Sequence, residues 1–170
     1  MNMTQTSTTI TVYELLAHLI DYPSAHLPTQ VRECAAALKM QRSRAARPIG
    51  YFRLFVEQVT LNDLEELYAA TFDLKPVCYP YIGYQLFGDT YKRGEFLARL
   101  NARYRESGFV VQGELPDHLG MILRYLARTW DADLVTEGMI PSLERMIEQL
   151  EGNPYRDLLR AILAVLREQG

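Results

Sequence analysis

Along most of this chain, apolar residues recur every three or four positions, which is the spacing of one face of an α-helix. The first such run begins at Val12 and stops before Pro23, because a proline disfavours helical geometry in the residue before it. A second run follows Pro28, which suits a first helical turn. Thr60 and Asp63 have the spacing of a capping box, so a further helix is expected to begin there.

The middle of the chain keeps this helical period with more interruptions. Residues 74–88 contain two prolines and an aromatic run, and the pattern predicts a short buried helix that ends near Gly88. Asp89 or Thr90 can cap the next helix, which Gly108 is expected to terminate.

Three more helices are predicted in the last third of the chain. The first carries apolar residues from Leu119 to Trp130 on one face. The other two cover about 141–150 and 154–168, and each is expected to begin at its proline. Only residues 109–111 have the β-branched and aromatic character of a strand, which is too little for a sheet.

Length and composition fit one compact unit. With 170 residues, 48% of them hydrophobic, the chain can bury one sizeable core but not two ordinary ones. We therefore predict an all-α fold, a single-domain helical bundle over residues 11–170. The polar residues 1–10 are expected to form a flexible N-terminus without signal-peptide character.

Charge and cysteine usage exclude several partners. A formal net charge of -3 provides no field for a polyanion, so nucleic-acid binding is not expected. Charges interrupt every apolar run, so direct membrane insertion is not expected either. Cys34 and Cys78 lie far apart without metal-ligand spacing, which fits a reducing cytoplasm.

Metal and cofactor chemistry lacks its usual patterns. His18, His26 and His118 fall in three different predicted elements, whereas a helical metal site needs ligands on one face. The glycines do not form a phosphate-binding loop, and no nucleophile elbow is present in the sequence. We expect no metal, no cofactor and no catalytic residue.

The segment GELPDHLG, residues 113–120, concentrates polar groups between two glycines. Pro116 suits a first helical position, and Glu114 and Asp117 favourably meet the positive end of a helix dipole, so the segment can be a helix start only. The same geometry also places His118 beside two carboxylates, where an imidazole can position a bound peptide. An enzyme that uses Asp117 and His118 as an acid–base pair is the alternative interpretation.

Four segments carry a family resemblance. They are YAATFDLKP at 68–76, GDTYKRG at 88–94, YRESGF at 104–109 and ELPDHL at 114–119. In order and spacing they resemble the NarJ-type nitrate reductase delta-subunit chaperones, part of the TorD/DmsD/NarJ group of redox-enzyme maturation chaperones.

The resemblance implies an all-helical assembly factor rather than an enzyme. It implies a client, the catalytic (alpha) subunit of a molybdoenzyme such as respiratory nitrate reductase, which is held through contacts that include its N-terminal peptide until the molybdenum cofactor is inserted, before membrane association. A homodimer and a permanent structural subunit of the oxidoreductase stay open, as does direct contact with the cofactor or a guanine nucleotide. Members often continue past the last core helix, so contacts of a longer tail are expected to be absent here.

The resemblance also implies a set of client-binding residues. These are Glu114, Pro116, Asp117, His118, Tyr81, Tyr84, Asp89 and Arg93. Asp117 would pair with a basic client side chain and His118 would hydrogen-bond the client backbone. Arg93 suits equally an ion-pair partner that fixes helix packing. The tyrosines suit either core packing or the wall of a peptide groove.

Overall fold

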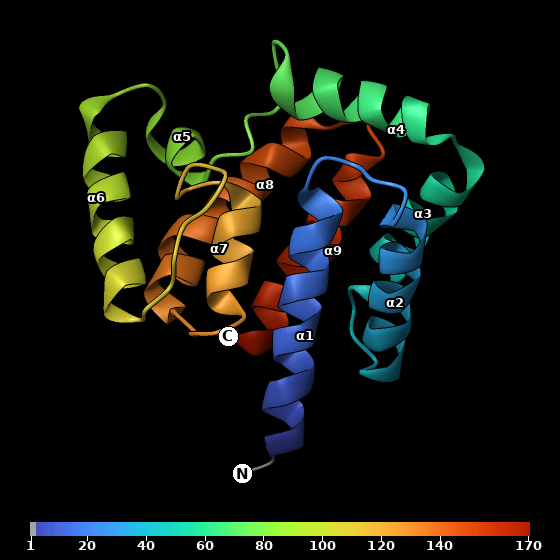
Figure 1. Ribbon diagram of the computed structural model, residues 1–170, viewed down its shortest axis with the longest axis horizontal. Helices are drawn as coiled ribbons and strands as arrows, with labels where there is room; N and C mark the ends of the chain where they lie inside the picture. The colour runs from blue at the N-terminus through green and yellow to red at the C-terminus, as the bar shows by residue number, and fades with distance from the viewer. Residues whose placement is uncertain (1–2) are drawn as a thin grey trace.

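The computed structural model describes the backbone of residues 3–170 and the side chains from Val12 onward, and all of its regular elements are helical (Figure 1). The elements are α1 (Met3–Ile20), α2 (Leu27–Met40), α3 (Ala46–Gln58), α4 (Leu61–Tyr68), the π-helical η1 (Ala69–Asp73), α5 (Ile82–Phe87), α6 (Tyr91–Glu106), α7 (Leu119–Leu126), the π-helical η2 (Leu134–Met139), α8 (Ile140–Gln149) and α9 (Tyr155–Gln169). The predicted all-α fold class is confirmed.

The first helix begins before the expected edge of the domain. Its backbone is helical from Met3, whereas the pattern predicted a domain from residue 11. Residues 1 and 2 lie outside the described part of the chain. The flexibility of residues 1–10 therefore stays a prediction.

Two long helices, α1 and α9, organise the packing (Figure 1). Helix α1 packs against α2 and α7, and α9 packs against α3 and α8. Aromatic side chains join the layers: the ring of Tyr155 on α9 lies 5.4 Å from Phe52 and 4.9 Å from Phe72. Burial of apolar surface, to which such large rings contribute, is the main source of stability in a folded domain. None of the helices described is long and apolar enough to cross a membrane.

Local chemistry explains several helix ends. The Thr60 hydroxyl accepts a hydrogen bond from the Asp63 N–H and the Asp63 carboxylate accepts one from the Thr60 N–H, so the predicted capping box is present. Gly88 follows α5 with φ of 63° and Gly108 follows α6 with φ of 72°, a conformation that favours glycine.

The prediction for Trp130 was wrong. Helix α7 ends at Leu126, and Trp130 lies beyond it, 37% exposed. The reason is Asp131, whose carboxylate accepts the Leu134 N–H and so favours a new helical segment.

Helix α8 begins at Ile140 with Pro141 in its first turn, close to the expected start, but η2 runs directly into it and had not been expected. In η2 the Ile140 N–H donates to the Val135 carbonyl, five residues back. This wider π-type turn accommodates a residue that has no N–H of its own. Helix α9, in contrast, begins directly after Pro154 as expected.

Replacing Thr60 with alanine removes the capping side chain of α4. We expect a loss of about 1 kcal/mol in the free energy of unfolding, measured by urea denaturation. Thr60→Ser keeps the hydroxyl and should retain most of the stability. Equal stability of the alanine and serine variants would contradict this role of the cap.

Candidate functional site

The segment 114–118 turns at Pro116 and Asp117, where the His118 N–H donates to the Leu115 carbonyl, and it lies against the start of α5. The Ile82 N–H donates to the Asp117 carbonyl at 2.8 Å, and the Leu119 N–H donates to the Pro80 carbonyl at 2.9 Å. These two bonds form an isolated antiparallel bridge between Tyr81 and His118. Two segments that are distant in the sequence are thereby fixed side by side.

The Asp117 carboxylate lies at the centre of this contact. Its Oδ2 accepts hydrogen bonds from the Gly83 N–H at 3.1 Å and from Arg93 Nε at 3.0 Å, and its Oδ1 accepts one from Arg93 Nη2 at 3.2 Å. The Asp117 side chain is 0% exposed and that of Arg93 is 19% exposed. One buried carboxylate thus joins α5 and α6 to the segment that precedes α7.

This burial corrects the expected role of Asp117. Its oxygens already bind groups within the chain, so in this structure it does not face a basic side chain of a client. Of the two interpretations of Arg93, the structure has the ion-pair partner that fixes helix packing. Pro116 is likewise held from within, because its carbonyl accepts the Tyr104 hydroxyl at 2.7 Å.

Sequence reasoning missed Gly83. A Cβ atom at this position would lie 2.6 Å from Asp117 Oδ2 and 2.9 Å from Cδ1 of Phe96, both too close for real contacts. Only a glycine lets α5 approach the carboxylate closely enough for the backbone hydrogen bond. The sequence pattern did not indicate a close contact at Gly83, because this residue lies inside an aromatic run that was expected to be helical.

His118 caps helix α7. Its Nδ1 accepts the Gly120 N–H at 3.1 Å, and the imidazole lies edge-on to the ring of Tyr81, 5.5 Å between centroids. Burial lowers the pKa of His118, so the ring is neutral near pH 7 and carries its proton on Nε2. No hydrogen bond joins His118 to Asp117, whose oxygens are directed at Gly83 and Arg93. The two residues therefore do not form an acid–base pair in this structure.

An exposed aromatic surface lies next to this buried centre, and we call it the tyrosine surface. It consists of Tyr79, Tyr81, Tyr84, Glu114 and Leu115. Tyr81 donates its hydroxyl to Glu114 at 2.8 Å, and the rings of Tyr79 and Tyr84 lie 4.0 Å apart. Burial, followed by the bond to Glu114, raises the pKa of Tyr81 to about 12, so the phenol stays protonated.

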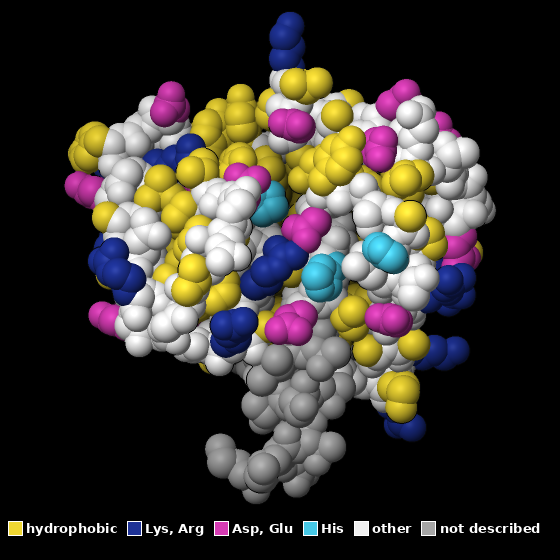
Figure 2. Space-filling model, viewed as in Figure 1, with side chains coloured by type: hydrophobic (Ala, Val, Ile, Leu, Met, Phe, Trp, Pro, Cys, Tyr) yellow, Lys and Arg dark blue, Asp and Glu magenta, His cyan; other side chains and the backbone are white. Residues whose placement is uncertain are grey.

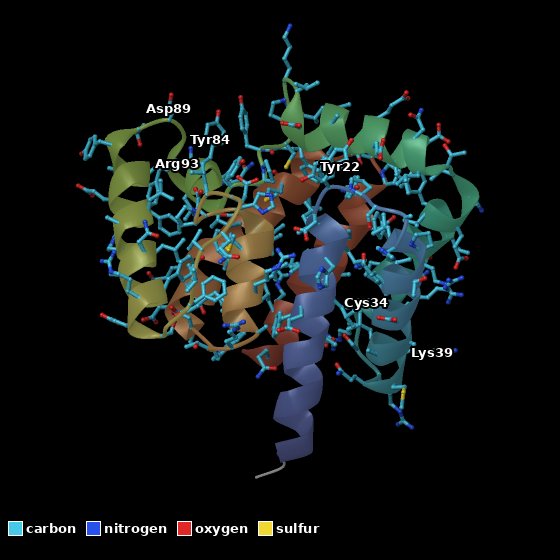
Figure 3. All side chains as sticks on the ribbon, viewed as in Figure 1. Tyr22, Cys34, Lys39, Tyr84, Asp89 and Arg93 are labelled. Carbon is cyan, nitrogen blue, oxygen red and sulfur yellow. The ribbon has the colours of Figure 1, made fainter. Side chains whose placement is uncertain are left out.

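The guanidinium of Arg93 packs against two rings of the tyrosine surface. Its guanidinium carbon lies 5.3 Å from the ring centroid of Tyr81 and 6.0 Å from that of Tyr84, within range of cation–π attraction. Figure 3 labels Tyr84 and Arg93 near the turn that carries Asp89, at the junction of α5 and α6. Asp89 is exposed at this turn.

The tyrosines are therefore not core residues: Tyr79 is 40% exposed, and Tyr81 and Tyr84 are partly buried. Figure 2 shows apolar and acidic side chains close together over the upper part of the face in view. Within residues 12–170, no three His, Cys, Asp or Glu side chains form a group that could hold a metal ion.

The fold belongs to a class seen in a solved structure. The crystal structure of a candidate redox enzyme maturation protein from Archaeoglobus fulgidus matches it with a TM-score of 0.64, over 98% of this chain and 95% of that one. At 19% sequence identity this likeness shows a common fold.

The sequence defines the family more closely. Residues 24–168 match the family described as nitrate reductase delta subunit, and the chain belongs to it. Proteins named nitrate reductase molybdenum cofactor assembly chaperone NarJ, from Escherichia coli K12 and from Escherichia coli O157:H7, are each 28% identical over 129 residues. The match covers 74% of this chain and 54% of theirs, so the chain spans about half the length of these curated relatives. The resemblance to NarJ-type chaperones is confirmed.

Gly83→Ala tests the close approach of α5 to Asp117. The added Cβ forces the carboxylate or the Phe96 ring to move, and we expect a loss of about 1–3 kcal/mol in the free energy of unfolding. Gly94→Ala on α6 is the matched control, because a Cβ there meets nothing within 4 Å. That variant should be neutral or up to about 1 kcal/mol more stable by helix propensity. Similar losses at both positions would contradict the packing argument.

The lowered pKa of His118 predicts a pH dependence of stability. The unfolded chain binds a proton at His118 near pH 6.5, whereas the folded chain resists it, so stability falls as the pH drops below about 6.5. His118→Asn keeps an acceptor for the Gly120 N–H but does not titrate. Denaturation between pH 5 and 8 should show a smaller decrease for this variant than for the wild type. An equal decrease in the free energy of unfolding for the variant and the wild type would exclude His118 as the source of the pH dependence.

Proposed function

We propose that this protein is a chaperone that binds the catalytic subunit of a molybdenum oxidoreductase, with respiratory nitrate reductase as the first candidate. It acts by stoichiometric binding and not as an enzyme, and it holds the subunit while the molybdenum cofactor is inserted, before membrane association. The family and the names of the Escherichia coli relatives support this role. The structural observation that carries it is the tyrosine surface, which is exposed and yet fixed in place by the buried Asp117.

The chemistry of this surface suits a peptide. Tyrosine rings give a large contact area at a low cost in conformational entropy, and their hydroxyl groups provide direction. Glu114 and Asp89 are exposed carboxylates beside the rings, so a peptide with basic residues complements the surface. We propose that the N-terminal peptide of the client binds here.

The eight predicted site residues then divide into two roles. Tyr81, Tyr84, Glu114 and Asp89 contact the client. Asp117, Pro116 and Arg93 position them, because their polar groups bind within the chain. His118 fixes the start of α7 through Nδ1 and leaves its Nε2–H as the donor for the client backbone.

The proposed complex forms in the cytoplasm. Cys34 and Cys78 are both buried as free thiols, which suits a reducing compartment. One chaperone with one client is sufficient for this function, and a homodimer stays a prediction.

The test removes a tyrosine from the surface and measures capture of the client. Tagged wild type and the Tyr84→Ala variant are recovered from native cells, with and without molybdenum starvation, and the bound proteins are identified by mass spectrometry. We expect wild type to recover a molybdoenzyme catalytic subunit. In a separate titration with the N-terminal peptide of that subunit, the variant should have a Kd at least about tenfold higher, since a central aromatic contact is worth about 2 kcal/mol. Tyr51→Ala on α3, 49% exposed in wild type, is the matched control.

Two results would contradict the proposal. The first is recovery of no molybdoenzyme subunit in either condition. The second is the presence of this chain in the mature, cofactor-loaded enzyme, which would identify it as a permanent subunit.

A further inference from the structure

A pocket of about 270 Å³ lies between α6 and η2, and we call it the α6–η2 pocket. Its apolar lining consists of Leu86, Phe87, Phe96, Leu100 and Leu134. Gly138 forms part of the wall without a side chain. This volume lies just below the range of small-molecule sites, about 300–1,000 Å³, and suits a single large apolar side chain.

Helix α6 forms one wall of this pocket and is fixed mainly at its two ends. Arg93 near its start pairs with Asp117, and Arg103 near its end donates to both oxygens of Asp131 at 2.6 and 2.7 Å. Between the ion pairs, the middle of α6 faces the pocket through Phe96 and Leu100. Among helices with extensive mutual contact in the described chain, α6 packs only against α5, and Figure 1 shows it at the edge of the bundle.

The rim of the pocket carries charges of both signs. Arg99 and Arg103 belong to the α6 wall, whereas Asp133 and Glu137 belong to the opposite wall. Arg103 is already paired with Asp131. The side chains of Arg99, Asp133 and Glu137 are exposed and form no hydrogen bond or ion pair within residues 12–170. The rim therefore carries one unpaired positive side chain and two unpaired negative ones, and this excess of negative charge favours a cationic group on a bound ligand.

We propose that the α6–η2 pocket binds one apolar side chain of the client, adjacent to an arginine or lysine that pairs with Glu137 or Asp133. This inference rests on the proposed function and adds a second contact to the tyrosine surface. The bound side chain buries its surface between Phe96, Leu100 and Leu134, which provides affinity, and the basic neighbour sets the direction of the peptide.

The first experiment uses defined probes and does not require the client. Wild-type protein with ¹³C-labelled leucine methyl groups is titrated with the blocked dipeptides acetyl-Leu-Arg-amide, acetyl-Leu-Glu-amide and acetyl-Ser-Arg-amide. We expect Leu-Arg to shift the methyl signals of Leu86, Leu100 and Leu134 with the lowest Kd. An equal response to Ser-Arg would exclude apolar recognition, and a stronger response to Leu-Glu would exclude the acidic rim as the determinant.

The second experiment reverses one rim charge. Glu137→Lys should raise the Kd for Leu-Arg at least about threefold and should not weaken Leu-Glu, because an exposed pair has a modest but measurable energy. Glu33→Lys on α2, also an exposed position, makes the same change of charge away from the pocket and should leave both Kd values unchanged. Equal effects of the two variants would overturn the proposal.

The proposal can fail separately from the proposed function. If the protein captures the client but the methyl signals of Leu86, Leu100 and Leu134 do not shift, the α6–η2 pocket is excluded as a binding site while the chaperone function stands. If the protein binds Leu-Arg selectively but captures no molybdoenzyme subunit, the pocket stands as a peptide site and the proposed client is excluded.

Discussion

The buried carboxylate of Asp117 is the interaction on which the arrangement of this protein's candidate site depends. It accepts hydrogen bonds from the backbone of α5 and from Arg93 of α6, while its own backbone carbonyl binds the first N–H of α5. A desolvated carboxylate is tolerated only when its oxygens are paired. The three segments must therefore meet in one arrangement, because any other would leave a charge buried without a partner.

This arrangement explains how an exposed surface can be well ordered. Large aromatic side chains on a loop and a six-residue helix would by themselves adopt several conformations. Here Arg93 lies beneath Tyr81 and Tyr84 and is held by Asp117, while Tyr81 is bonded to Glu114. A surface fixed before binding loses less conformational entropy when a peptide binds. The same ion pair holds one end of α6 and so also one wall of the α6–η2 pocket.

The sequence predicted what local chemistry determines. The helical period, the capping box at Thr60 and the glycine at the end of α5 depend on neighbours within a few residues, and all are present in the structure. The burial of Asp117 was not predictable, because its partners lie 24 and 34 residues away and no pattern specifies that contact. Pro141 lies in the first turn of α8 as expected, whereas the π-helical η2 that runs into α8 was not predicted.

The candidate site was found through family motifs, and only the structure divided it into buried and exposed residues. The acidic–proline–aspartate–histidine segment had been expected to touch the client as a whole. Instead, Glu114 and Leu115 are exposed and Asp117 is fully buried, so one short segment both anchors the fold and borders the surface.

The central claim is that the client binds at the tyrosine surface, and site-specific photo-crosslinking in native cells tests it most directly. A photoreactive amino acid is placed at position 84, or at position 51 on α3 as the control, and the captured peptides are sequenced by mass spectrometry. We expect position 84 to capture the N-terminal segment of a molybdoenzyme catalytic subunit, and position 51 not to capture it. Capture of the same segment from both positions, or of no such segment from position 84, would contradict it.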